Sequence, residues 1–192
     1  MAADRPFRST FAAAAEIHQD GVMFDQRLTE VARRVGELLR ERGETVAVAE
    51  GSAGGLISAG LLSVPGASSY YLGGTVVYTA AASRAWMAGA VETPPKMRGA
   101  TEVFAMYLAR SVAVKLGATW GIGEAGAAGP ANPYGDPAGH TWLAVAGPSD
   151  VTRNLLTGVD DRSANMVEFA VAALELLAES LAKSFAEPTE SM

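Results

Sequence analysis

The chain has 192 residues, of which 49% are hydrophobic and 19% charged, and its formal net charge is −6. These values exclude a largely disordered chain and are typical of one domain with a sizeable core. Because there is no cysteine, disulfides, thiol catalysis and zinc–thiolate sites are also excluded. The acidic balance and the lack of a Lys/Arg run argue against nucleic acid or an acidic membrane surface as a partner.

The chain offers little for a metal site or a membrane. Its two histidines, His18 and His140, have no partner at metal-ligand spacing, so no metal and no other cofactor is expected. No apolar run approaches the roughly 18 residues of a membrane span. The first residues, which include Asp4, Arg5 and Arg8, lack the apolar core of a secretory signal. These features favour a cytoplasmic location.

Helix-like and strand-like apolar periods alternate along the chain. Residues 1–21 are expected to form an N-terminal extension, with a short helix over 11–17 or a mobile tail as alternatives, and residues 187–192 form a loose tail. In chain order, the pattern predicts helices over 24–42, 53–62, 80–88, 97–116 and 161–184 and strands over 45–49, 70–78, 118–124, 140–146 and 151–156. Residues 22–186 are therefore expected to form one α/β domain, a three-layer α/β/α sandwich with a mixed, mostly parallel sheet.

Two loops of small residues follow strands of the predicted sheet. The first, Gly51-Ser52-Ala53-Gly54-Gly55, joins a strand to a helix, where unpaired backbone N–H groups favour an anion. The second runs from Gly123 to Pro130. Ligands of α/β sheets collect where such loops meet at the carboxyl ends of the strands. The alternative is that the glycines only allow close packing of strand and helix.

Polar residues of types that take part in catalysis lie beside these loops. Glu50 and Glu124 each follow an apolar run directly, a place where acids are rarely needed for packing. Two carboxylates brought close together would raise the pKa of one and make it a base. Alternatively, each acid pairs with a helix N-terminus or an arginine. Ser68 and Ser69 occupy a tight turn. A hydroxyl there either is unobstructed by bulky side chains or simply caps the turn.

The order of the motifs resembles the CinA C-terminal domain family over roughly residues 24–184. The motifs are Glu50…Gly54-Gly55, Pro65-Gly66-Ala67-Ser68, Gly74-Thr75-Val76-Val77-Tyr78, Gly126-Ala127-Ala128-Gly129-Pro130, Gly139 and Asp161-Arg162. That family contains nicotinamide-nucleotide amidohydrolases. The resemblance implies an α/β homo-oligomer that hydrolyses nicotinamide mononucleotide, or a related small carboxamide, to a carboxylate and ammonia without a metal.

The resemblance also implies roles for individual residues. Ser68 matches the nucleophilic serine, Tyr78 the tyrosine at the end of the second strand, and Arg162 an arginine near the substrate. The substrate-binding positions that it implies are Gly51, Ser52, Gly54, Gly55, Ala125 and Gly126, in addition to Arg162. We expect the loops at 50–55, 66–69 and 124–130 to line one cleft.

Several positions depart from the family pattern. Hydroxyl positions of the family loops are occupied by Gly51, Ala53 and Ala125, and its catalytic lysine has no counterpart, Arg84 being the nearest residue. Because arginine does not lose its proton, a carboxylate, Glu124 or Glu50, must accept the proton of the nucleophile. Arg84 would then bind an anion or hold that carboxylate in place. The alternatives are a nucleotide- or anion-binding protein that has lost the reaction, and a structural partner that assembles through Ala-rich helices.

Overall fold

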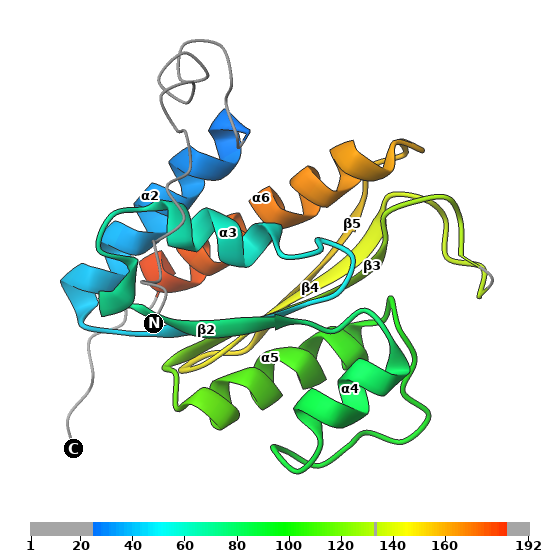
Figure 1. Cartoon of the computed structure of the whole chain (residues 1–192), viewed down its shortest axis with the longest axis horizontal. Helices are drawn as coiled ribbons and strands as arrows, with labels where there is room; N and C mark the ends of the chain where they lie inside the picture. Colours follow the sequence, from blue (N-terminus) through cyan, green and yellow to red (C-terminus); the bar gives the residue numbers. More distant parts are fainter. Residues whose placement is uncertain (1–24, 133, 184–192) are drawn as a thin grey trace, which may run out of the picture.

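The computed structural model describes residues 25–132 and 134–183. The expected N-terminal extension over 1–21, with its helix over 11–17, and the expected tail over 187–192 lie outside these residues. The elements in chain order are α2 (Gln26–Arg42), β1 (Val46–Glu50), α3 (Leu56–Ser63), the short 3-10 helix η2 (Ala67–Ser69), β2 (Tyr71–Val76), α4 (Ala80–Met87), α5 (Glu102–Leu116), β3 (Trp120–Ala127), β4 (His140–Ala146), β5 (Val151–Leu156) and α6 (Arg162–Lys183) (Figure 1).

Local capping explains where the helices begin and end. The side chain of Asp25 accepts a hydrogen bond from the backbone N–H of Arg27 (2.8 Å) and starts α2, and Gly43 ends it in the left-handed region. Helix α5 begins at Glu102, later than the predicted residue 97, because the hydroxyl of Thr101 caps it. Helix α3 begins at Leu56, later than the predicted residue 53, because the preceding Gly-rich residues form a non-helical turn.

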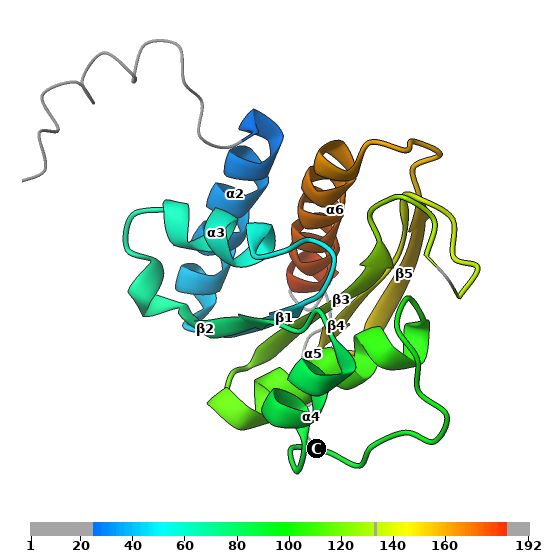
Figure 2. The same ribbon diagram turned by 45° about the vertical axis from the view of Figure 1, so that its right-hand side comes forward.

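The five strands form one sheet in the order β2-β1-β3-β4-β5. Strand β1 pairs in parallel with β2 and β3, whereas β4 is antiparallel to both β3 and β5. Four of the five strands therefore run in the same direction. Helices α2, α3 and α6 cover one face of the sheet, and α4 and α5 cover the other (Figures 1 and 2). The predicted α/β/α sandwich with a mixed, mostly parallel sheet is confirmed.

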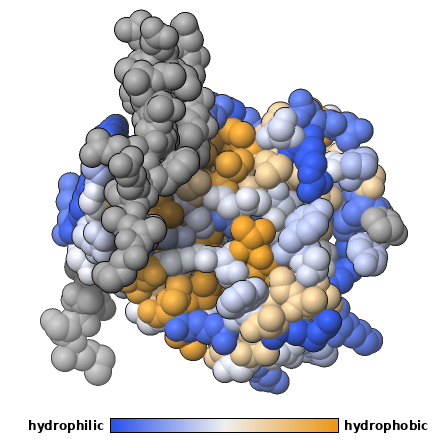
Figure 3. Space-filling view, in the orientation of Figure 1, coloured by the Kyte–Doolittle hydropathy of each residue, from blue (hydrophilic) through white to orange (hydrophobic). Residues whose placement is uncertain are grey.

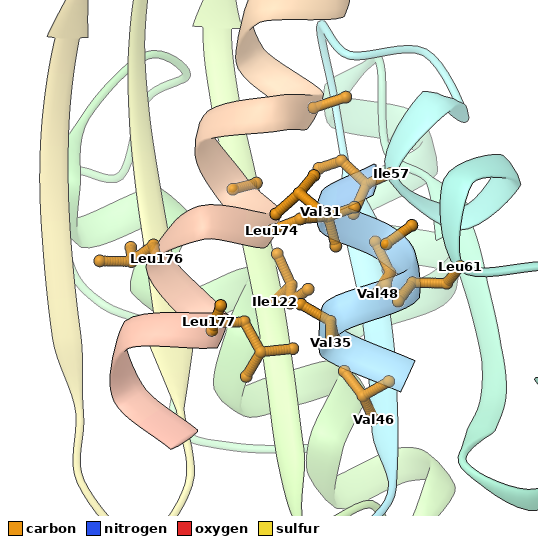
Figure 4. Close-up of a cluster of buried hydrophobic side chains, with 14 of the residues drawn as sticks. Val31, Val35, Val46, Val48, Ile57, Leu61, Ile122, Leu174, Leu176 and Leu177 are labelled. Carbon is orange, nitrogen blue, oxygen red and sulfur yellow. The ribbon is translucent and has the colours of Figure 1, made fainter. Parts of the chain in front are cut away.

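The larger core lies between the sheet and the α2–α3–α6 layer (Figure 4). Val35 of α2 and Leu174 of α6 are fully buried against Val48 of β1 and Ile122 of β3. The apolar face of each helix, with its i, i+3, i+4 spacing, supplies these contacts. This layer holds α3 and α6 at a fixed distance from the sheet. The N-terminal ends of both helices lie at the carboxyl ends of the strands.

The opposite core is built on small residues. A Cβ at Gly121 or Gly123 would overlap the backbone carbonyl of Ala109 or Ala105, respectively. Helix α5 therefore lies closer to β3 than side chains would permit. Together the two layers bring the carboxyl ends of β1 and β3 side by side, and Glu50 and Glu124 are partners in the parallel register.

Candidate active site

The centre of the site is the carboxylate of Glu124 in β3, which is fully buried. Its Oε2 accepts hydrogen bonds from the backbone N–H groups of Gly51 (3.0 Å) and Ala53 (2.8 Å). Its Oε1 accepts hydrogen bonds from the hydroxyls of Ser52 and Thr141, the latter at 2.8 Å. Burial raises the pKa of Glu124 above its ordinary value, although these donors act in the opposite direction. Glu124 is therefore a buried carboxyl that takes up a proton more readily than an exposed one.

Glu50 has a different role in the structure. Its Oε2 accepts hydrogen bonds from the N–H groups of Gly55 (2.9 Å) and Ile57 (3.1 Å), and its Oε1 accepts from the N–H (3.0 Å) and hydroxyl (2.7 Å) of Ser58. All these donors belong to the start of α3, whose unpaired N–H groups and dipole favour a negative charge. Of the two alternatives for Glu50, the geometry favours a helix cap over a catalytic base.

A pocket of about 250 Å³ opens beside the Ser52–Glu124 pair. It lies between the β1–α3 turn, the residues after β2, the β3–β4 loop and the start of α6. Its lining residues are Ser52, Tyr78, Gly126, Ala127, Ala128, Gly129, Pro130, Ala131, Asn132 and Arg162. We call it the Ser52 pocket. Ser52 is 5% exposed, so its hydroxyl lies at the inner wall, between the pocket and the buried carboxylate.

Arg162, the first residue of α6, supplies a cation to the Ser52 pocket. Its guanidinium donates to the carbonyl of Gly129 (2.6 Å) and to the hydroxyl of Tyr78 (3.1 Å), and it lies over the Tyr78 ring. Within residues 25–132 and 134–183, no carboxylate forms an ion pair with Arg162. This positive charge is therefore available to an anion.

Buried polar side chains hold the wall of the pocket in place. The amide of Asn165 in α6 donates to the carbonyls of Ala128 (2.7 Å) and Val159 (2.8 Å) and accepts from the hydroxyl of Thr157. Sequence reasoning missed both Asn165 and Thr141. The signal for Thr141 was a polar residue inside an apolar strand, and the signal for Asn165 was an amide on the apolar face of a helix.

Arg84 does not touch Glu124. It is exposed on α4 and lines a second pocket on the other side of Tyr78. The donors to the Glu124 carboxylate come instead from the β1–α3 turn and β4. The expectation that Arg84 holds this carboxylate is therefore wrong, and the anion-binding alternative remains.

Ser68 lies at the amino ends of the strands, whereas the Ser52 pocket lies at their carboxyl ends. It belongs to η2, which leads into the start of β2, and the carbonyl of neighbouring Tyr70 accepts from the N–H of Val46, the first residue of β1. Glu50 is the last residue of β1, and four strand steps span roughly 13 Å. The expectation that the 66–69 loop shares a cleft with the 50–55 and 124–130 loops is wrong, because α3 carries the chain back to the amino ends of the strands.

The remaining expected binding positions divide into two groups. Ser52 and Gly126 line the pocket, whereas Gly51, Gly55 and buried Ala125 do not. Gly51 and Gly55 contribute backbone N–H groups to the two carboxylates. Gly54 has a positive φ of 67°, and a Cβ there would lie 2.6 Å from the terminal carbon of Met166, so it allows close packing. The loop glycines thus have both of the roles considered in the sequence analysis: Gly51 and Gly55 present backbone N–H groups to a negative charge, and Gly54 allows close packing.

Comparison with known proteins identifies the family. The CinA C-terminal domain model matches residues 28–181. The chain belongs to this family. A CinA-like protein of Salinibacter ruber is 38% identical over 143 residues, which are 73% of this chain and 34% of that protein. A CinA-like protein of Synechocystis sp. is 36% identical over 140 residues, 72% of this chain and 34% of that protein. The chain spans about a third of the length of these relatives.

Solved structures of the CinA superfamily have the same fold over nearly their whole length. A superfamily protein from Klebsiella pneumoniae aligns with a TM-score of 0.76 and 26% identity, covering 82% of this chain and 99% of that one. The competence/damage inducible protein CihA from Agrobacterium tumefaciens gives 0.75 and 26%, covering 83% and 98%. In the described part of this CinA-family chain, no helix is long and apolar enough to span a membrane, and no group of His, Asp or Glu is arranged to hold a metal.

Proposed function

We propose that this CinA-family chain is a metal-independent amidohydrolase that cleaves the carboxamide of nicotinamide mononucleotide or a related small carboxamide. The observation that carries the proposal is the hydrogen bond from the Ser52 hydroxyl to the buried carboxylate of Glu124 at the wall of the Ser52 pocket. A hydroxyl next to a base of raised pKa is the arrangement that nucleophilic catalysis requires. The proposal moves the nucleophile from Ser68 to Ser52.

In the proposed reaction, the Ser52 oxygen attacks the carboxamide carbon and its proton passes to Glu124. The C–N bond then breaks, ammonia leaves with that proton, and an ester to Ser52 remains. Water, deprotonated by Glu124, attacks the ester, which releases the carboxylic acid product and returns the proton to Ser52. The net change is carboxamide plus water to carboxylic acid plus ammonia, which become carboxylate and ammonium by transfer of one proton. Arg162 favours the negative charge that develops on the attacked carbonyl oxygen.

The experiment measures ammonia released from a panel of carboxamides, including nicotinamide mononucleotide. We expect Ser52→Ala to lower turnover by a factor of about 100 or more, because it removes the attacking atom. Ser68→Ala is the matched control and should leave the rate unchanged. Chelation of divalent ions should also have no effect. A rate that depends on Ser68 and not on Ser52 would refute the assignment.

A second candidate is a nucleotide- or anion-binding protein that has kept the pocket and lost the reaction. The observation that favours it is Arg162, a cation of the pocket without a carboxylate partner in the described chain. Binding of nicotinamide mononucleotide in calorimetry, together with no release of ammonia from any carboxamide, would establish this function instead.

We also propose that the chain is a cytoplasmic homo-oligomer whose other partners are small molecules. Apolar surface along the edge strand β2 supports association, because Leu72 and Val76 are 42% and 43% exposed. Hydrophobic side chains are also exposed in several places on the face shown in Figure 3. Strand β2 has neither a charged residue nor a proline, the usual features that protect a sheet edge from pairing. Light scattering at micromolar concentration tests this, and a monomer would refute it.

A further inference from the structure

We propose that Thr141 is a positioning residue for the proposed reaction: from β4, its hydroxyl holds the Glu124 carboxylate in the state that accepts the proton of Ser52. The inference deepens the proposed function and rests on it. It gives a task to a fully buried side chain that does not line the Ser52 pocket. It also ties the pH dependence of the reaction to that side chain.

The four hydrogen-bond donors to Glu124 differ in what the proposed reaction does to them. The two backbone N–H groups on Oε2, those of Gly51 (3.0 Å) and Ala53 (2.8 Å), belong to the β1–α3 turn and do not react. The two hydroxyls on Oε1 are those of Ser52 and Thr141, the latter at 2.8 Å. Ser52 gives up its proton and then carries the acyl group, so it no longer donates. Thr141 is then the one hydroxyl among the described residues that still donates to Oε1.

A glycine on the neighbouring strand makes room for this contact. Thr141 and Gly126 are partners in the antiparallel register of β3 and β4. Gly126 lies two residues after Glu124, so the two positions face the same side of the sheet. A Cβ at Gly126 would lie 2.6 Å from both Cβ and Oγ1 of Thr141, so a side chain there would displace the hydroxyl. The pairing of the two strands therefore sets the hydrogen bond to Glu124.

The elements packed around the carboxyl of Glu124 bring charges of both signs. Glu50 of β1, its partner in the parallel register, adds a negative charge that opposes ionisation. Arg162 of α6 adds a positive charge on the Ser52 pocket. His140 of β4 is one residue from Thr141, so its side chain faces the other side of the sheet. The acidic residues just before α6 are Asp160 and Asp161. The turn over residues 51–55 has no titratable side chain.

Hydrogen bonds favour the ionised form of this carboxyl. Burial is the largest influence and raises the pKa of Glu124, whereas the hydrogen bonds from Ser52, Ala53 and Thr141 lower it. Ser52 is the reacting group, and the donor of Ala53 is backbone. Thr141 is therefore the donor that a side-chain substitution can remove without touching the nucleophile. Because a hydrogen bond to a charged acceptor is stronger than one to a neutral acceptor, its loss favours the protonated form.

The single hydrogen of the Thr141 hydroxyl has two acceptors within reach. One is Oε1 of Glu124 at 2.8 Å, and the other is the backbone carbonyl of Trp142 at 3.4 Å. Once Glu124 has taken the Ser52 proton on Oε1, the Thr141 hydroxyl can turn to this carbonyl and accept a hydrogen bond from the new carboxyl O–H. The same side chain thus donates to the base and accepts from its conjugate acid, which keeps the buried proton hydrogen-bonded.

The test replaces Thr141 in the full chain and measures the protonation of Glu124 directly. Infrared titration follows the carboxylic-acid band, which is assigned by its absence in Glu124→Gln. Thr141→Val keeps the shape of the side chain and removes the hydroxyl, so we expect the midpoint to rise by roughly 1–2 pH units, the equivalent of one hydrogen bond to a charged group. Thr141→Ser should restore the midpoint. Thr141→Cys, whose thiol is a weak donor, should raise it by less and keeps the test valid if the valine variant does not fold.

Ammonia release across pH shows whether turnover follows the same midpoint. Just above the midpoint of the unmutated chain, kcat of Thr141→Val should be about 10- to 100-fold lower, the equivalent of the shift in pH. KM should not change, because Thr141 does not line the pocket. Thr152→Val is the matched control. It removes another hydroxyl–carboxylate hydrogen bond, from Thr152 of β5 to Glu102 at 2.7 Å, and should leave both midpoints unchanged.

The outcomes separate this proposal from the proposed function. Equal infrared midpoints for Thr141→Val and the unmutated chain would overturn the role of Thr141, as would a shift that Thr141→Ser does not reverse. A shifted infrared midpoint with an unchanged pH profile of turnover would also overturn it, because ionisation of Glu124 would not then limit the reaction. A shift that serine reverses, in a chain that releases no ammonia from any carboxamide, would support the hold of Thr141 on Glu124 and refute only the proposed reaction.

Discussion

Replacement of Glu124 separates its chemical role from its structural one. Glutamine has nearly the shape of glutamate and keeps one oxygen, which can face the N–H groups of Gly51 and Ala53. Its NH2 group can then donate to the hydroxyls of Ser52 and Thr141, which also accept hydrogen bonds. Each of these groups therefore keeps at least one hydrogen bond in Glu124→Gln, and we expect the free energy of unfolding to change by less than about 1 kcal/mol.

The loss in free energy of unfolding caused by Glu124→Leu can be estimated from the hydrogen bonds that it removes. Gly51 keeps a second acceptor, the backbone carbonyl of Glu124 at 3.0 Å, and Thr141 keeps the carbonyl of Trp142 at 3.4 Å. The N–H of Ala53 has no such second acceptor among the described hydrogen bonds, and the Ser52 hydroxyl is nearly buried. One to two stranded polar groups at about 1–3 kcal/mol each give a loss of roughly 1–6 kcal/mol for Glu124→Leu.

Urea unfolding of the two variants measures the stability difference, and ammonia release measures the chemistry. Glu124→Gln should fold like the unmutated chain and lose turnover by a factor of about 100 to 10,000, because it removes a general base. A Glu124→Gln variant that keeps its turnover would refute the role of Glu124 as the base. Equal unfolding free energies for the glutamine and leucine variants would refute the count of stranded donors.

Because the pKa of Glu124 is raised, the difference in stability between the unmutated chain and Glu124→Gln should depend on pH. The folded state binds this proton more tightly than the unfolded chain, whose carboxyl has the ordinary value of 4.5. As pH rises from that value through the folded pKa, the unmutated chain should therefore lose stability relative to Glu124→Gln. Turnover should fall as pH decreases, with a midpoint above the ordinary glutamate range. Urea midpoints that are parallel across pH would contradict this linkage.

Three further predictions concern the fold. Gly123→Ala should lower the free energy of unfolding by about 3 kcal/mol or more, because its Cβ overlaps a backbone carbonyl of α5, while Gly99→Ala, with open space and no positive φ, should change it by less than about 0.5 kcal/mol. Asp136→Asn should cost about 1–3 kcal/mol in urea unfolding at neutral pH, and this difference should disappear in acid, because Arg98 holds the pKa of Asp136 below its usual range. Asp25→Ala removes the cap of α2 and should cost about 0.5–2 kcal/mol, measured by thermal unfolding.

Much of the fold could be predicted because its elements have distinct apolar periods. The helix over 24–42 and the strands over 140–146 and 151–156 were predicted to within two residues of α2, β4 and β5. The start of α5 was less accurate, because a single capping hydroxyl at Thr101 fixes it and the apolar pattern does not.

The candidate site was predictable where residues follow a strand directly. Ser52 and Glu124 come together because the carboxyl ends of β1 and β3 share an edge of the sheet. Ser68 was misplaced, although a loop from a helix into the next parallel strand must lie at the amino ends. The contact of Thr141 with Glu124 depends on the register of the β3–β4 pair, in which Gly126 and Thr141 are partners. Local periodicity does not fix that register.

The glycines of β3 also determine how the site can move. Gly121 lies under Ala109 and Gly123 under Ala105, so α5 runs antiparallel to β3. Two strand residues advance about 6.6 Å and four helix residues about 6 Å, so successive turns of α5 match successive glycines.

A slide of α5 by one such step in either direction would place the Cβ of Thr119 or Ala125 beneath the helix, where only hydrogen fits. Helix α5 is thereby locked in register, and Phe104, in its first turn, is a stationary wall of the second pocket. Any closure of this CinA-family site around a ligand must therefore come from elements other than α5, such as α4, the β1–α3 turn, the β3–β4 loop and the start of α6.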